Sequence, residues 1–254
     1  MSERITIEEL RALTQPESVR MRANAEHWVA YVYLRKFSPY LTRILIRMNF
    51  SPNAVTWLMI VTGFSAALAL LIPGMWGVTL ALLLGQLQML WDCCDGEIAR
   101  WRKQFSPAGI FLDKLGHYLA EAFIPICFGL RLANWPNEPI NSTIYPYFGA
   151  LLAILIILNK GFNDAVHVAR AFSGLAKIQD QSGANLPVKG ILRSIRKVFN
   201  FLPAQRIFHS VEFTIYVALF SSFTQSLQVA LGIALFVTVG HIAAIVTSAK
   251  LRGE

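Results

Sequence analysis

The sequence predicts an all-α integral membrane protein with six transmembrane helices and an N-terminal interfacial amphipathic helix. Three observations support this: only 15% of the 254 residues are charged, 55% are hydrophobic, and the apolar residues gather in long runs. A soluble domain usually has about 25% charged residues, and about 20 apolar residues are enough to cross a bilayer as a helix. The composition excludes a disordered chain and disfavours a soluble one.

The first 50 residues precede the apolar runs. Residues 1–25 carry charges throughout, so we expect a polar tail without the apolar core of a signal peptide. Residues 26–50 mix aromatic side chains with four basic ones, namely Arg35, Lys36, Arg43 and Arg47. Such a composition is typical of a helix that lies in the membrane interface. We therefore predict a cytoplasmic tail and interfacial helix over 1–50, followed by one six-helix membrane domain over 51–254.

Six apolar segments are each predicted to be a transmembrane helix. They are Ala54–Ile72, Trp76–Trp91, Ile110–Leu132, Ile144–Leu158, Glu212–Phe223 and Leu227–Thr247. The third is polar at its start and the fifth is short. Each hydrophobic run is thus long enough, or nearly so, for one crossing.

Basic residues mark alternate connections between these segments. They lie before the first segment, between the second and third, between the fourth and fifth, and after the sixth, whereas the third-to-fourth connection holds only Arg131. Because Lys and Arg are enriched in cytoplasmic connections, both termini are predicted to be cytoplasmic, in the inner membrane if the source is bacterial. The net charge of +8 therefore indicates contact with anionic membrane lipid, and no nucleic-acid partner is expected.

Acidic residues concentrate where the second and third segments flank a basic connection. Five of the 15 acidic residues lie between Trp91 and Phe123, namely Asp92, Asp95, Glu97, Asp113 and Glu121. Carboxylates at the membrane border are costly unless they are paired or bind metal, so they indicate a functional site.

The spacing of these residues predicts that they meet. At about 100° per residue, Asp92 and Asp95 share one helix face, and Asp113, His117 and Glu121 share a face of the next helix. The short connection makes the two helices antiparallel neighbours. Asp92, Asp95 and Asp113 are therefore predicted to converge as oxygen ligands for Mg²⁺ or Mn²⁺.

The small and basic residues nearby indicate a phosphate-bearing ligand. Gly96, Ala99 and Gly109 remove side-chain bulk, so that a nucleotide can approach the backbone. Arg100 is placed to pair with a phosphate.

The stretch from Asp92 to His117 resembles the signature of the CDP-alcohol phosphotransferase (CDP-alcohol phosphatidyltransferase) family, D-x2-D-G-x2-A-R-x8-G-x3-D-x3-D. Seven of its eight fixed positions match, namely Asp92, Asp95, Gly96, Ala99, Arg100, Gly109 and Asp113. Upstream, the run from Ser51 to Thr56 is similar to the family's Pro-Asn-x-x-Thr opening of the first span. The six-helix layout agrees over most of the remaining chain.

The resemblance implies a specific reaction. Such enzymes transfer a substituted phosphate from a CDP-alcohol, CDP-diacylglycerol in most members, to a hydroxyl acceptor and release CMP. By motif position, the metal ligands would be Asp92, Asp95 and Asp113, and the CDP site would include Asn53, Thr56, Gly96, Ala99, Arg100 and Gly109. The resemblance also implies a homodimer whose site opens to the cytoplasm.

Position 117 departs from the family pattern, because His117 stands where the family has an aspartate that binds metal and acts as the proposed base. Three interpretations remain open. The imidazole can be the base, since its pKa lies near working pH. It can ligate the metal while Glu121 restores the missing carboxylate. Alternatively, the chain has lost the usual reaction or uses an unusual acceptor.

The connection before the fifth segment supplies candidate acceptor-binding residues. Lys189, Arg193 and Arg196 are spaced to form one helical face, which would suit an acceptor that carries phosphate or an anionic lipid. Ordinary enrichment of basic residues in a cytoplasmic connection is the alternative explanation.

Three functions are compatible with the sequence as a whole. The first is transfer from a CDP-linked lipid to a polar alcohol. The second reverses the roles and moves a small CDP-linked head group onto a lipid hydroxyl. The third is a membrane protein that binds nucleotide or metal without turnover. A transporter is disfavoured, because transporters hold polar residues at mid-membrane depth in several helices.

Overall fold

The computed structural model describes residues 5–20, 29–175 and 207–246, and within these ranges every regular element is a helix. In chain order they are α1 (Ile7–Thr14), α2 (Glu17–Arg20), the π-helical η1 (Ala30–Leu34), α3 (Arg35–Arg47), α4 (Pro52–Ala69), α5 (Gly74–Arg102), α6 (Pro107–Leu132), α7 (Tyr145–Phe172), α9 (Ser210–Phe220) and α10 (Ser226–Val246). The prediction of an all-helical chain is confirmed for these residues.

Four of the described helices, α4, α5, α7 and α10, are long and apolar enough to cross a membrane. The protein is therefore an integral membrane protein. Helix α6 covers the predicted third segment, but it carries the charged residues Asp113, Lys114 and Glu121. Helix α9 has only 11 residues, which is short for a crossing.

Two helices are longer than the apolar runs that predicted them. Helix α5 continues past Trp91 to Arg102 and ends where Lys103 adopts a left-handed backbone with φ of 53°. Helix α7 continues past Leu158 to Phe172. Hydropathy located only the apolar part of each helix, because the extensions are polar and carry the site residues.

Helices α4 and α6 begin in the same way. Each starts with proline in its first turn after a serine N-cap: the Ser51 hydroxyl accepts from the Ala54 amide, and the Ser106 hydroxyl accepts from the Gly109 amide. Serine N-caps and N-terminal prolines both favour a helix start. Helix α4 packs against both α6 and α5. The N-termini of α4 and α6 therefore lie near the C-terminal end of α5.

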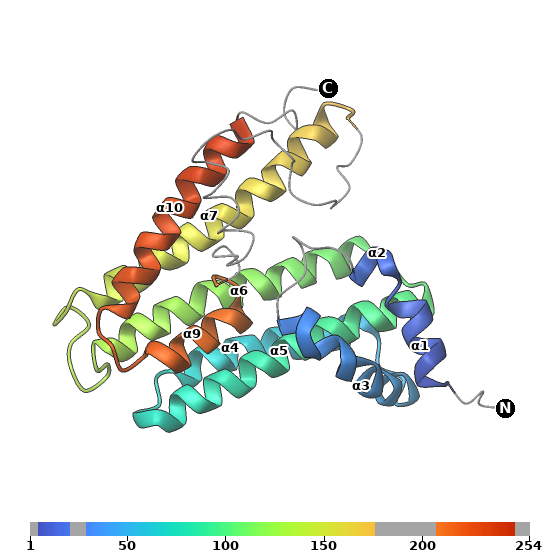
Figure 1. The fold of residues 1–254 in the computed structure, drawn as a ribbon, viewed down its shortest axis with the longest axis horizontal. Helices are drawn as coiled ribbons and strands as arrows, with labels where there is room; N and C mark the ends of the chain where they lie inside the picture. The colour runs from blue at the N-terminus through green and yellow to red at the C-terminus, as the bar shows by residue number, and fades with distance from the viewer. Residues whose placement is uncertain (1–4, 21–28, 176–206, 247–254) are drawn as a thin grey trace.

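Figure 1 shows how these helices are arranged. Helices α4, α5, α6 and α9 lie roughly parallel to one another, while α7 and α10 run side by side at an angle to them. The short helices α1, α2 and α3 gather at the end where α5 turns into α6. The main apolar core lies between the long helices and contains Phe128, Leu152, Phe213 and Leu227.

Glycines allow α6 and α7 to approach at backbone distance. A Cβ atom at Gly129 would lie 2.5 Å from the Tyr145 carbonyl oxygen, and one at Gly149 would lie 2.5 Å from the Pro125 carbonyl oxygen. Small residues permit close helix packing in membranes. The contact fixes how α7 meets α6, the helix that carries most of the site.

Replacing Gly149 by alanine is predicted to push α6 and α7 apart, because the Pro125 carbonyl is backbone and cannot rotate away. We expect a destabilisation of about 1–3 kcal/mol, measured as a lower unfolding temperature in detergent. Gly161→Ala on the same helix is the control, since nothing lies within 4 Å of an added Cβ there. Equal unfolding temperatures for the two variants would contradict the packing argument.

Candidate active site

The turn from α5 to α6 brings two carboxylates and an imidazole together. His117 Nε2 lies 3.0 Å from Asp92 Oδ1 and 3.7 Å from Asp113 Oδ1. One ligand atom from each of the three residues can be chosen so that all lie within 4.8 Å of one another. Asp92 projects from α5 and the other two from α6, where they are one turn apart.

The third predicted ligand, Asp95, lies beside this group and has a partner of its own. Its side chain is 8% exposed, and its Oδ2 accepts a hydrogen bond of 2.7 Å from the Thr56 hydroxyl on α4. The structure therefore brings Asp92 and Asp113 together with His117, and it orients Asp95 by a contact to the first long helix.

The donor set fits a divalent cation. Two carboxylates this close repel each other in a partly buried site, and a doubly charged ion between them would remove that repulsion. Carboxylate oxygens suit Mg²⁺ and Mn²⁺, whereas imidazole is a more common ligand of transition metals. Asp92 and Asp113 are the residues that would hold the ion, with Asp95 next to them and His117 Nε2 at 3.0 Å from the Asp92 carboxylate.

The small motif residues face polar side chains. A Cβ atom at Gly109 would lie 3.1 Å from Asn53 Oδ1, and one at Gly96 would lie 3.1 Å from Nη1 and 3.2 Å from Nη2 of Arg100. The Arg100 Nε donates to the Thr14 carbonyl at 2.5 Å. Ala99 is partly exposed one turn before Lys103. The predicted nucleotide-binding residues thus border the carboxylates on the side where α4 and α6 begin.

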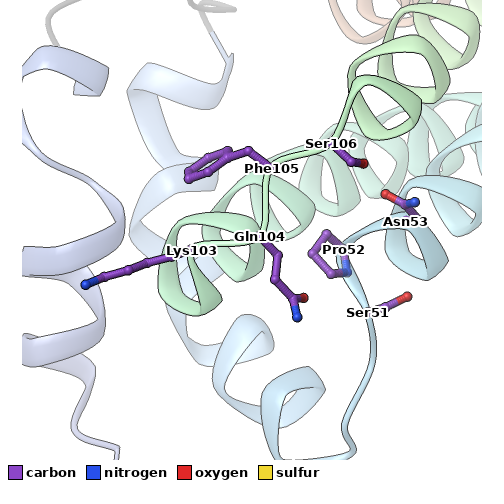
Figure 2. Close-up of a pocket in the computed structure, with 7 residues that line it drawn as sticks. All are labelled: Ser51, Pro52, Asn53, Lys103, Gln104, Phe105 and Ser106. Carbon is purple, nitrogen blue, oxygen red and sulfur yellow. The ribbon is translucent and has the colours of Figure 1, made fainter.

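A pocket of about 310 Å³ lies at this end of the molecule (Figure 2). Its lining comes from the start of α4 and from the α5–α6 turn: Ser51, Pro52, Asn53, Lys103, Gln104, Phe105 and Ser106. In Figure 2 Asn53 and Ser106 face each other, while Lys103 extends away. Two helix N-termini with their positive ends border the pocket, and Asn53 lies about one turn from Thr56. The pocket is therefore close to the carboxylates.

Sequence reasoning missed the surroundings of Glu121. This carboxylate is buried, and its Oε1 lies 2.8 Å from Lys160 Nζ on α7 and 3.1 Å from His209 Nδ1 before α9. His117 Nδ1 is 3.8 Å from the same oxygen. Oε1 is thus engaged by two other helices rather than by the metal group. Lys160 directly after an apolar run was the available signal, since an ionisable residue at the end of such a run usually has a partner.

The predicted acceptor-binding residues Lys189, Arg193 and Arg196 lie outside the described residues. The next polar contact along α6 and α7 is the ion pair of Lys114 with Asp164, whose carboxylate also accepts from the Tyr118 hydroxyl at 2.5 Å. Polar side chains therefore extend along the α6–α7 interface.

The sequence profile of the CDP-alcohol phosphatidyltransferase family matches residues 49–240. The chain belongs to this family. No curated protein sequence matches it significantly. CDP-alcohol phosphatidyltransferases move a phosphate-linked group from a CDP-alcohol to an acceptor, and the family is metal-dependent. The matched residues include every element of the site from α4 to α9, whereas α1 and α3 lie before them.

Removal of the Glu121 carboxylate is predicted to destabilise the protein. Glu121→Ala leaves Lys160 and His209 beside each other without their shared counter-ion, which costs about 3 kcal/mol for a buried pair. The free energy of unfolding in detergent measures the loss. The double variant with Glu121→Gln and Lys160→Met should lose less free energy of unfolding than the two single variants lose together.

The more exposed ion pair of Lys114 with Asp164 provides the control. Lys114 is 48% exposed, so Lys114→Met should change stability by only about 0–1 kcal/mol. Two results would show that burial does not control the strength of these contacts. One is a double variant whose loss of unfolding free energy equals the sum of the losses of the Glu121 and Lys160 single variants. The other is a loss for Lys114→Met as large as that for Glu121→Ala.

Proposed function

We propose that the protein transfers a substituted phosphate from CDP-diacylglycerol to a hydroxyl of a polar acceptor and releases CMP, as a Mg²⁺- or Mn²⁺-dependent step of phospholipid synthesis. The observation that carries the proposal is the approach of Asp92, Asp113 and His117 to within 4.8 Å of one another. This group stands beside a pocket bordered by two helix N-termini, which favours an anionic ligand.

The order of residues along α6 supports separate donor and acceptor sides. Gly109 lies against Asn53, which lines the pocket. Asp113 and His117 follow one and two turns later, and Glu121 follows one turn after that. Eight residues from Asp113 to Glu121 correspond to about 12 Å of helix. The nucleotide would occupy the pocket end, and the acceptor would approach His117 from the side of α7.

The protein's own residues have distinct roles in this reaction. When bound, the metal would neutralise the diphosphate and the charge that develops on departing CMP. Arg100 would pair with a phosphate oxygen, and Gly96 and Gly109 would let the nucleotide approach the helix backbones. His117 would accept the acceptor's proton at Nε2, the nitrogen that faces Asp92 and Asp113, and the carboxylate of Asp92 would stabilise the resulting imidazolium.

The membrane organisation of the proposed enzyme follows from its charge pattern. We propose that α6 and the region of α9 also cross the bilayer, giving six spans, with the α5–α6 turn and the active site on the cytoplasmic side. Arg100, Arg102 and Lys103 at that turn support the orientation. A homodimer, in which residues 1–50 of each chain form a cytoplasmic tail and a helix in the membrane interface, completes the proposal.

The proposed reaction predicts metal-dependent release of CMP. Purified protein incubated with CDP-diacylglycerol and a panel of alcohols should release CMP only when Mg²⁺ or Mn²⁺ and a suitable alcohol are present. Asp92→Asn should abolish the release, because it removes a carboxylate that the metal requires. CMP release without metal contradicts the mechanism, and a lipid product formed from a CDP-linked head group would indicate that the roles of the two substrates are reversed.

The identity of the base predicts how substitutions at His117 behave. His117→Asp should retain or raise turnover, because it restores the family's residue at that position. His117→Ala should lower kcat by about 10²–10⁴-fold, the usual contribution of general base catalysis. A steady-state assay with CMP as readout measures both variants, and full activity of His117→Ala would remove His117 from the chemistry.

A further inference from the structure

Helix α1 lies outside the family match but contacts the signature residues on α5. The match begins at residue 49, whereas α1 spans Ile7–Thr14. The Thr14 carbonyl accepts the Arg100 Nε at 2.5 Å, and the Gln15 amide donates to Glu97 Oε1 at 2.8 Å. A segment that the family match does not cover is therefore built into the edge of the candidate donor site.

Glu97 anchors this segment. Its side chain is buried, and a buried carboxylate is stable only with hydrogen-bond donors around it. Besides Gln15, the Ser38 hydroxyl donates to Oε1 at 2.5 Å and the Thr42 hydroxyl donates to Oε2 at 2.7 Å. The Gln15 amide also donates to the Arg35 carbonyl at 2.8 Å. One carboxylate thus connects α1, α3 and α5.

Helix α1 itself has a buried face and an exposed face. Leu10 and Thr14 on the buried face are 0% exposed, whereas Leu13 is 63% exposed. Thr6 and Glu9 form a capping box at the start of the helix, which stabilises it locally. The helix is therefore a defined element with one face packed against the rest of the protein.

The contact with Thr14 determines how Arg100 presents its guanidinium. Side chains on a helix point toward its N-terminus, and the Arg100 side chain accordingly lies over Gly96, with Nη1 and Nη2 as the nearest atoms. Because Thr14 holds Nε, the plane of the guanidinium is fixed. Arginine recognises phosphate through two parallel N–H groups, and a side chain ordered before binding loses less entropy when the ligand arrives.

We propose that α1 is a structural part of the donor site: the Thr14 carbonyl and the Gln15–Glu97 contact position the Arg100 guanidinium over Gly96 for the diphosphate of the donor. The inference rests on the proposed function, because it takes a CDP-alcohol as the ligand. Leu10, Thr14 and Gln15 are positioning residues that act through Arg100 and do not contact the donor themselves.

The test displaces α1 without changing any residue of the site. Leu10→Arg puts a charge on the buried face of α1, and Leu13→Arg makes the same change on its exposed face as the control. Affinity for CDP is measured by calorimetry on the full chain in detergent with Mg²⁺, and KM and kcat are measured with CDP-diacylglycerol. We expect Leu10→Arg to weaken CDP binding and raise the donor KM by about tenfold, the loss of one charge-assisted contact, with a smaller change in kcat.

A double-mutant cycle separates positioning from a general loss of structure. Arg100→Ala should weaken CDP binding about as much as Leu10→Arg, and the double variant should bind no worse than Arg100→Ala alone, because both changes remove one interaction. Gln15→Glu, which sets two carboxylates against each other at Glu97, is a second way to displace α1 if Leu10→Arg does not fold. Size-exclusion chromatography and unfolding temperature monitor the fold of each variant.

The outcomes distinguish the inference from the function it rests on. If the unmodified protein shows no saturable CDP binding, the proposed function is wrong and the inference falls with it. If the unmodified protein binds CDP but Leu10→Arg and Gln15→Glu bind it equally well, the inference alone is wrong. The inference is also wrong if the losses of CDP affinity caused by Leu10→Arg and Arg100→Ala multiply in the double variant.

Discussion

The site depends on negative charge held between α5 and α6 at the membrane border. Asp92 and Asp113 come from antiparallel helices and meet at His117, whose Nε2 is 3.0 Å from the Asp92 carboxylate. Carboxylates this close are stable only if a positive charge or a hydrogen-bond donor shares the site. A shift of one residue in either helix would rotate a ligand by about 100°, so the orientation of α5 and α6, which both pack against α4, is the constraint on which the candidate chemistry rests.

Each buried carboxylate near this centre has partners from a different helix. Asp95 accepts from Thr56 on α4, Glu97 accepts from residues around α1 and α3, and Glu121 pairs with Lys160 on α7. Unpaired buried charges are costly, so these contacts hold the surrounding helices against α5 and α6. The acidic residues therefore organise this end of the helix bundle as well as the candidate metal site.

Positive helix N-termini and negative carboxylates follow one another from the pocket into the site. The pocket at the starts of α4 and α6 has two positive helix ends, and the carboxylates begin one helical turn deeper. A ligand that carries a diphosphate and a divalent cation would match this order, with the phosphates toward the helix N-termini and the cation toward the carboxylates. This arrangement agrees with membership of a metal-dependent family whose donors are CDP-alcohols.

The sequence by itself determined the helical class and the meeting of Asp92 with Asp113, because helical periodicity and a short connection are local properties. The expectation that α5 and α6 pack directly against each other was wrong, since both helices pack instead against α4. Only the tertiary structure decided which partners the other polar groups take. Glu121 meets His209, 88 residues away, and Arg100 meets Thr14, 86 residues away. Such contacts depend on how distant helices pack, and no spacing along the chain encodes that packing. For the same reason hydropathy placed the ends of α5 and α7 too early, since their polar extensions are stabilised by neighbouring helices.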